Sequence, residues 1–414
     1  MKQRQAIWIM ISVMLLSLLG TIGIALPYPV LAPYFLDSPA NELTHFLGIH
    51  PKILLGLSLA IYPLGMLIGS VFIGALSDHF GRRRMLLITL IGTIIGYFLT
   101  ALAIVYESFI GFSVARLLTG ICEGNISIAR ALAAELHPTI DRTRALSLSY
   151  AANYTGWLVG PLIGAWMMPF GVEHVFNVAA IGIVFVLILV YFTIPSLRKE
   201  HKPGPLQLST LLKENNSLNL LKHKSILPIF WFYFIYCLGL NAFYEFYPVW
   251  FVDVLGADSR QIASSTIALT ACMVIVSSFL VDKINRRFGE ILSIISGSFI
   301  LALLLAYQPL TNATSVYAVF MLIGASIAVT NGMIPTYLSK YFGHLGQGKV
   351  MGLQVSVFCI ANIIIALIGG PISILDASYI LWLGAGLMLL ATVVMLLSRH
   401  RQYRMIEQTQ ETSS

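Results

Sequence analysis

The chain has 414 residues, of which 57% are hydrophobic and only 10% are charged. This balance is too apolar for a water-soluble fold and predicts a polytopic membrane protein surrounded by the lipid bilayer. The net charge of +7 does not indicate a nucleic-acid partner, because the basic residues stand in short clusters between long apolar runs.

Twelve apolar runs come close to the length of roughly 20 residues that a helix needs to cross a bilayer. They cover residues 7–32, 52–76, 85–106, 108–136, 144–169, 173–194, 226–252, 260–281, 290–308, 314–341, 349–370 and 377–398. Lysine and arginine concentrate in every second connection, and the connections on the opposite side have only Lys52 and Arg260. The positive-inside rule therefore places both termini in the cytoplasm, and the short loops favour a bacterial inner membrane.

The one long polar connection, residues 195–225, is expected to be a cytoplasmic linker, because it is rich in proline and has a Lys/His-rich end. It separates a six-helix bundle at 1–194 from a second bundle at 226–398, and a cytoplasmic tail follows at 399–414. The chain has no phosphate-binding Gly-x-x-x-x-Gly-Lys-Ser/Thr loop and no catalytic triad, so we expect neither an enzyme nor an ATP-driven pump. The four cysteines lie inside apolar runs without Cys-x-x-Cys spacing, so we expect no metal site and no cofactor.

A tight basic connection follows the second run and reads Gly74-Ala-Leu-Ser-Asp78-His-Phe-Gly81-Arg82-Arg83-Arg84. Gly74 lets two helix ends approach closely, Asp78 can pair with an arginine and a helix end, and Gly81 suits the positive φ of a tight reversal. The arginines are expected to hold the connection on the cytoplasmic side. The pattern resembles the loop between helices 2 and 3 of the major facilitator superfamily of transporters, which implies a role in conformational gating.

A second copy of this connection reads Val281-Asp282-Lys-Ile-Asn-Arg286-Arg287-Phe-Gly289. Asp282 stands 204 positions after Asp78, which is close to half of the 414 residues. Because the same loop returns with the same sidedness, an even number of spans separates the copies, and the halves are parallel repeats. The sequence therefore predicts an all-α polytopic membrane protein with 12 transmembrane helices in two pseudo-symmetric six-helix bundles, the major facilitator fold.

The fourth run contains the densest set of ionisable residues within a span, Arg116, Glu123 and Arg130. Seven residues turn a helix by roughly 700°, about 20° short of two turns, so the three side chains share one face at steps of about 10 Å. One charge in hydrocarbon costs at least roughly 2.5 kcal/mol, so this face is expected to line a water-filled cavity. The alternative is that the three residues lock their helix to its neighbours through buried ion pairs.

Two patterns resemble those of proton-coupled members of the superfamily. Arg116-Leu-Leu-Thr-Gly120 is similar to the Arg-x-x-x-Gly motif of helix 4, where the resemblance associates the arginine with proton coupling. The fifth run resembles the antiporter motif of helix 5, with alanine in place of the last glycine, and reads Gly156-Trp-Leu-Val-Gly160-Pro161-Leu-Ile-Gly164-Ala. Small residues there make a groove for a partner helix, and Pro161 bends the span at a pivot between the halves. The alternative is an ordinary packing face of small residues.

Three prolines of the first run, Pro27, Pro29 and Pro33, resemble the proline-containing helix 1 of the drug:proton antiporter group. Together with the two motifs above, they favour export.

The seventh run places Glu245 among aromatic residues, one turn after Asn241. Glu245 joins Glu123 and Arg116 as a candidate for proton coupling, and Tyr244 can either stack on an aromatic substrate or belong to an interfacial belt. The expected substrate contacts are Arg116, Arg130, Asn241, Tyr244, Glu245, Asn331, Gln354 and Asn362. The position that corresponds to Arg116 in the second half is Phe320, so the ionic residues concentrate in the first half.

We interpret the chain as a secondary active transporter that exports a small organic compound in exchange for protons by alternating access, and we expect a monomer. Two arginines against one glutamate on the fourth run also suit an importer or a carrier of anionic compounds, such as carboxylate metabolites or carboxylate siderophores. A hypothesis from a different functional class is a non-transporting membrane sensor or scaffold, which the short tails do not support.

Overall fold

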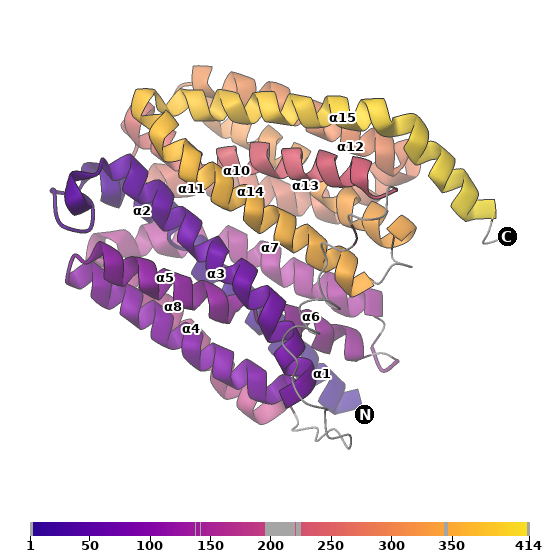
Figure 1. Cartoon of the computed structure of the whole chain (residues 1–414), viewed down its shortest axis with the longest axis horizontal. Coiled ribbons are helices and arrows are strands. Elements are labelled where there is room, and N and C mark those ends of the chain that lie inside the picture. Colours follow the sequence, from indigo (N-terminus) through magenta and orange to yellow (C-terminus); the bar gives the residue numbers. More distant parts are fainter. Residues whose placement is uncertain are drawn as a thin grey trace. The chain divides into compact units, whose positions relative to one another are not determined.

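Helices make up the computed structural model of the chain (Figure 1), which describes residues 3–136, 138–140, 142–194, 220, 225–342 and 347–411. The α-helices are α1 (Gln3–Ala25), α2 (Tyr28–Asp37), α3 (Pro51–Phe80), α4 (Arg82–Val105), α5 (Phe109–Glu123), α6 (Ile126–Glu135), α7 (Arg142–Met167), α8 (Val172–Thr193), α10 (Leu227–Leu255), α11 (Ser259–Phe279), α12 (Val281–Tyr307), α13 (Ser315–Phe342), α14 (Gln347–Leu375) and α15 (Ala377–Glu411). The predicted linker at 195–225 lies almost entirely outside the described residues, whereas the predicted tail at 399–414 continues α15 as far as Glu411.

Within the described residues, ten helical stretches are long and apolar enough to cross a membrane. The remaining two predicted spans correspond to α5 together with α6, which have only 15 and 10 residues, and to the more polar α7. The predicted all-α membrane fold is therefore present.

Two of the predicted spans are broken where a single straight helix was expected. The span at 7–32 is divided into α1 and α2 around Pro27, because Pro27 and Pro29 supply no backbone N–H for the helical hydrogen bonds. The span at 108–136 is divided at a turn formed by Gly124 and Asn125. Arg130 consequently lies on α6 and not on the helix that holds Arg116 and Glu123, so the estimate based on one continuous helix does not apply to it.

The two basic connections are more helical than a loop. α3 continues to Phe80, and the reversal into α4 is made by Gly81 alone, whose φ is 96°. The second connection lies inside α12, which is kinked at Gly289 with a φ of 73°. Positive φ favours glycine because it has no Cβ, so in each connection the helical conformation is interrupted at a glycine.

The helices pack into two compact units, residues 1–215 with 258–267, and residues 216–257 with 268–414. In the first unit α1 packs on α7 and α8, whereas α4 packs on α5 and α8. In the second unit α10 packs on α14 and α15, whereas α12 packs on α13 and α15. These pairings correspond one to one along the chain, as expected of two parallel repeats.

Glycines bring α3 and α5 into backbone contact within the first unit. A Cβ added at Gly65 or Gly69 of α3 would overlap backbone atoms of α5, and one added at Gly120 would overlap the carbonyl oxygen of Tyr62. Small residues at such spacing let two membrane helices approach closely.

The same approach recurs in the second unit without the charges. Gly324 of α13, 204 positions after Gly120, lies against the backbone of Leu269 in α11. The residues that correspond to Arg116 and Glu123 are Phe320 and Ile327, and both are fully buried. The repeat therefore preserves the helix packing and not the ionisable side chains.

The small residues of α7 face α1. Gly156, Gly160 and Gly164 lie against Thr21, Ala25 and Leu26, respectively, with too little space for a side chain. The role of Pro161 as a pivot stays a prediction.

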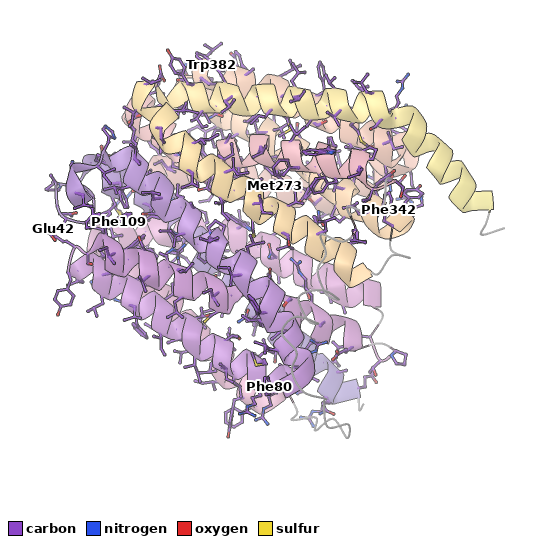
Figure 2. All side chains as sticks on the ribbon, in the orientation of Figure 1. Glu42, Phe80, Phe109, Met273, Phe342 and Trp382 are labelled. Atoms are coloured by element: carbon purple, nitrogen blue, oxygen red, sulfur yellow. The ribbon has the colours of Figure 1, made fainter. Side chains whose placement is uncertain are left out.

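Large apolar side chains cover the outer faces of the helices, as Figure 2 shows for Trp382 on α15 and Phe80 at the end of α3. Trp382 is 42% exposed and donates its indole N–H to the carbonyl of Ala306 at 3.1 Å. Exposed apolar side chains of this size suit contact with lipid.

Candidate functional site

The first unit holds a buried carboxylate between two tyrosine hydroxyls. Glu123, at the end of α5, is only 7% exposed. Its Oε1 atom accepts a hydrogen bond of 2.7 Å from the hydroxyl of Tyr97 on α4, and its Oε2 atom accepts one from the hydroxyl of Tyr62 on α3. Neither tyrosine was predicted from the sequence.

Glycines place both tyrosines. Gly120 allows the backbone of α5 to touch α3 at Tyr62, and Arg116 and Glu123 lie about one turn to either side of Gly120 on the same face of α5. Gly23 of α1 makes room for the hydroxyl of Tyr97, which a side chain at that position would overlap. The close approach at Gly120 thus brings both Arg116 and Glu123 to the side chain of Tyr62.

Arg116 is buried among aromatic rings. Its guanidinium carbon lies 4.4 Å from the ring centroid of Tyr62 and 5.8 Å from that of Phe176, and the residue is 6% exposed. Among the described residues its Nη1 atom has no hydrogen-bond partner. Cation–π contacts compensate only part of the cost of burying a charge, so this guanidinium retains an unused capacity to bind an anion.

The structure brings together two of the three ionisable residues predicted for this face. Arg116 and Glu123 are both buried and both contact Tyr62, whereas Arg130 is half-buried on α6.

A second buried carboxylate lies in the other unit. Glu245 of α10 is 4% exposed, and its Oε1 atom accepts a hydrogen bond of 2.6 Å from the side-chain amide of Asn362 on α14. The same amide nitrogen donates to Oδ1 of Asn241 at 3.0 Å, and Asn241 donates to the carbonyl of Cys237 at 2.9 Å. Three residues predicted as substrate contacts therefore form one hydrogen-bonded cluster that joins α10 to α14.

The other predicted contacts of this unit lie on α10 or contact tyrosines of α10. The hydroxyl of Tyr236 donates to Oδ1 of Asn331 at 3.0 Å, and Gln354 interacts with the hydroxyl of Tyr233. Tyr244 is half-buried, and its ring contacts that of Phe243. Tyr233 and Tyr236 were not predicted, because nothing in the sequence distinguishes them from other aromatic residues of the seventh span.

Asn362→Leu is expected to destabilise the second unit more than Asn331→Leu. The first change removes the amide donor of a buried carboxylate, and the second removes only an acceptor from a tyrosine hydroxyl. Losing a hydrogen bond to a charged buried group costs more than the roughly 1–3 kcal/mol of a neutral one. Thermal unfolding of the detergent-solubilised variants measures the difference, and equal midpoints would contradict this description of the cluster.

Each arginine of the first basic connection has its own contact. Arg82 forms an ion pair of 3.0 Å with Glu135 at the end of α6, and Arg83 donates to the carbonyl of Tyr191 at 2.7 Å while its guanidinium lies over that ring. Arg84 lies over the ring of Phe80. Gly74 and Asp78 are part of α3, but the surroundings of these two residues lie outside what the structure describes.

The second basic connection is exposed. Asp282, Arg286 and Arg287 are all exposed, and Arg286 donates to the carbonyl of Asp282 at 3.4 Å within α12. Nearby, Lys340 at the end of α13 pairs with Glu290 of α12 at 3.0 Å. Both units therefore have an ion pair between corresponding helices. The basic residue is on α4 and the acidic one on α6 in the first unit, whereas the acidic residue is on α12 and the basic one on α13 in the second.

Comparison with known proteins agrees with this architecture. The sequence model of a family described as "Major Facilitator Superfamily" matches residues 9–366. The chain is 26% identical over 367 residues to "Multidrug resistance protein 2" of Bacillus subtilis, covering 86% of this chain and 87% of that protein. It is 25% identical over 298 residues to the "Cis,cis-muconate transport protein" of Acinetobacter baylyi, covering 70% and 71%. The crystal structure of a D-xylose-proton symporter superposes with a TM-score of 0.75 at 19% identity, covering 94% of this chain and 97% of that one.

Proposed function

Because the chain belongs to the Major Facilitator Superfamily and is a multi-pass membrane transporter, we propose that it exports a small organic compound in exchange for protons. In this proposal the halves at 1–194 and 226–398 alternate between two access states, and the connections with Asp78 and Asp282 gate the motion. The protein works as a monomer in a bacterial plasma membrane, with both termini in the cytoplasm.

The buried carboxylate of Glu123 carries this proposal. A carboxylate that accepts two tyrosine hydroxyls is stabilised in its charged form, whereas burial away from water favours the neutral form. A conformational change that admits water or separates a tyrosine shifts this balance and so binds or releases a proton. A proton carrier needs such a shift between its two access states.

Two observations support export. One relative is named "Multidrug resistance protein 2", and the glycines of α7 make the groove for a partner helix that the resemblance to the antiporter motif predicts. Glu245 and its cluster in the other unit are proposed as substrate contacts, because a buried carboxylate on a helix rich in aromatic residues suits recognition of a polar or cationic group.

Transport assays with the purified full-length protein in liposomes test the proposal. A proton gradient is expected to drive accumulation of ethidium against its concentration gradient, and cells that express the protein are expected to retain less ethidium than cells that do not. Protein-dependent accumulation of the probe inside cells would establish import and contradict the direction.

A second candidate is a carrier of organic anions, and Arg116 is the observation that favours it. A buried guanidinium with an Nη1 atom that has no hydrogen-bond partner among the described residues suits a carboxylate. The relative from Acinetobacter baylyi, named for transport of muconate, a dicarboxylate, supports this class. Liposomes that take up benzoate and not its uncharged analogue benzamide would establish it.

A further inference from the structure

The side chain of Tyr62 contacts both ionisable residues of the first unit through different parts of its ring system. Its hydroxyl donates to the carboxylate of Glu123, and its ring lies under the guanidinium of Arg116 at 4.4 Å. Tyr97 makes the matching hydrogen bond to the other oxygen of Glu123, while the rings that stack on Arg116 are those of Tyr62 and Phe176. Both tyrosine hydroxyls therefore donate to Glu123, but among the described residues it is the ring of Tyr62, and not that of Tyr97, that stacks on Arg116.

We infer that Tyr62 is a positioning residue that transmits the protonation state of Glu123 to the guanidinium of Arg116. The inference rests on the proposed role of Glu123 as the proton site and adds the route by which a proton changes the binding of an anionic group. Tyr62 itself neither gains nor loses a proton in this route.

The route follows from hydrogen-bond chemistry. An ionised carboxylate accepts strongly from both hydroxyls, but a protonated one has an O–H donor and a weaker acceptor, so at least one tyrosine loses its strong bond. If the Tyr62 hydroxyl is released, its ring shifts, and the guanidinium stacked on that ring shifts with it. The N–H groups of Arg116 then face different surroundings in the two protonation states.

Among the described residues, Glu123 interacts electrostatically with Arg116 and Cys122 of α5, with Tyr62 of α3 and with Tyr97 of α4. Tyr97 also interacts electrostatically with Arg116. Arg116 and Glu123 are seven residues apart on α5, which is about 10 Å along the axis, so a direct electrostatic effect exists besides the route through Tyr62. The test must separate these two effects.

A matched pair of variants separates them without a known substrate. Tyr62→Phe and Tyr97→Phe each remove one hydroxyl from Glu123, and only the first interrupts the route to Arg116. In each background, and in the wild-type protein, the shift in unfolding temperature caused by Arg116→Gln is measured at a low and a high pH, about pH 4.5 and pH 9. The difference between the two shifts reports how strongly Arg116 responds to the protonation of Glu123.

The pH-dependent difference is expected to be at least halved in Tyr62→Phe and to persist in Tyr97→Phe. An equal difference in both backgrounds would overturn the inference, because the direct electrostatic effect would then suffice. Glu123→Gln should remove the difference in every background. If the difference survives Glu123→Gln, another group titrates, and the proposed proton site fails independently of Tyr62.

Discussion

Glu123→Gln is expected to reduce proton-driven accumulation of substrate to the level of liposomes without protein, while exchange of substrate across the membrane continues. Glutamine keeps the size and one oxygen that accepts from one of the two tyrosine hydroxyls, while its NH2 group can donate to the oxygen of the other, but it cannot bind or release a proton. The helix packing at the end of α5 is therefore retained, and coupling is lost. Uphill uptake under a proton gradient and counterflow without a gradient measure the two properties separately.

Glu42→Gln is the matched control for this change. Glu42 is exposed in the connection between α2 and α3, so the same substitution there neutralises an exposed carboxylate outside the two basic connections. Uphill uptake should remain close to wild type. A comparable loss of uptake in both variants would indicate a general sensitivity to charge and not a specific proton site.

Gly120→Leu is expected to prevent stable folding of the first unit. The backbone of α5 touches the carbonyl oxygen of Tyr62 at this glycine, so a leucine side chain would force α3 and α5 apart. Overfilling a packed interior typically costs about 1–3 kcal/mol, and backbone atoms yield less readily than side chains. The change would also separate Tyr62 from Glu123 and Arg116. Yield of monodisperse protein and its unfolding temperature measure the effect.

Gly20→Leu provides the comparison, because no atom lies within 4 Å of a Cβ added at Gly20 of α1. This variant should express and unfold much as wild type does. A Gly120→Leu protein that is as stable as Gly20→Leu would show that α3 and α5 are not in backbone contact.

The architecture was largely predictable because it depends on properties that are local in the sequence. Apolar runs and basic connections gave the spans and the parallel repeat, and Gly81 showed the expected positive φ. The breaks in the first and fourth spans at Pro27 and Gly124 were missed. Both positions lie within continuous apolar sequence, and hydropathy does not show where the helical hydrogen bonds are interrupted.

For the candidate site, the sequence allowed prediction of which residues share a face of one helix, but not of which residues from different helices meet. Helical periodicity placed Arg116 and Glu123 on one face, but it could not identify Tyr62 and Tyr97, which come from two other helices. The glycines at positions 65 and 120 could have indicated a close contact between these helices, although not its register. In the other unit Asn241, Glu245 and Asn362 were each predicted, and their shared hydrogen bonds depend on how α14 packs on α10.

The most direct test of the proton site is the proton movement that substrate induces in proteoliposomes containing wild-type protein, Glu123→Gln or Glu245→Gln. The wild-type protein and Glu245→Gln should both move protons when substrate is added, the latter at higher substrate concentration, since Glu245 orients substrate. Glu123→Gln should move none. If Glu123→Gln moves protons with substrate and Glu245→Gln does not, the roles are reversed, and Glu123 is a structural partner of Tyr62 and Tyr97.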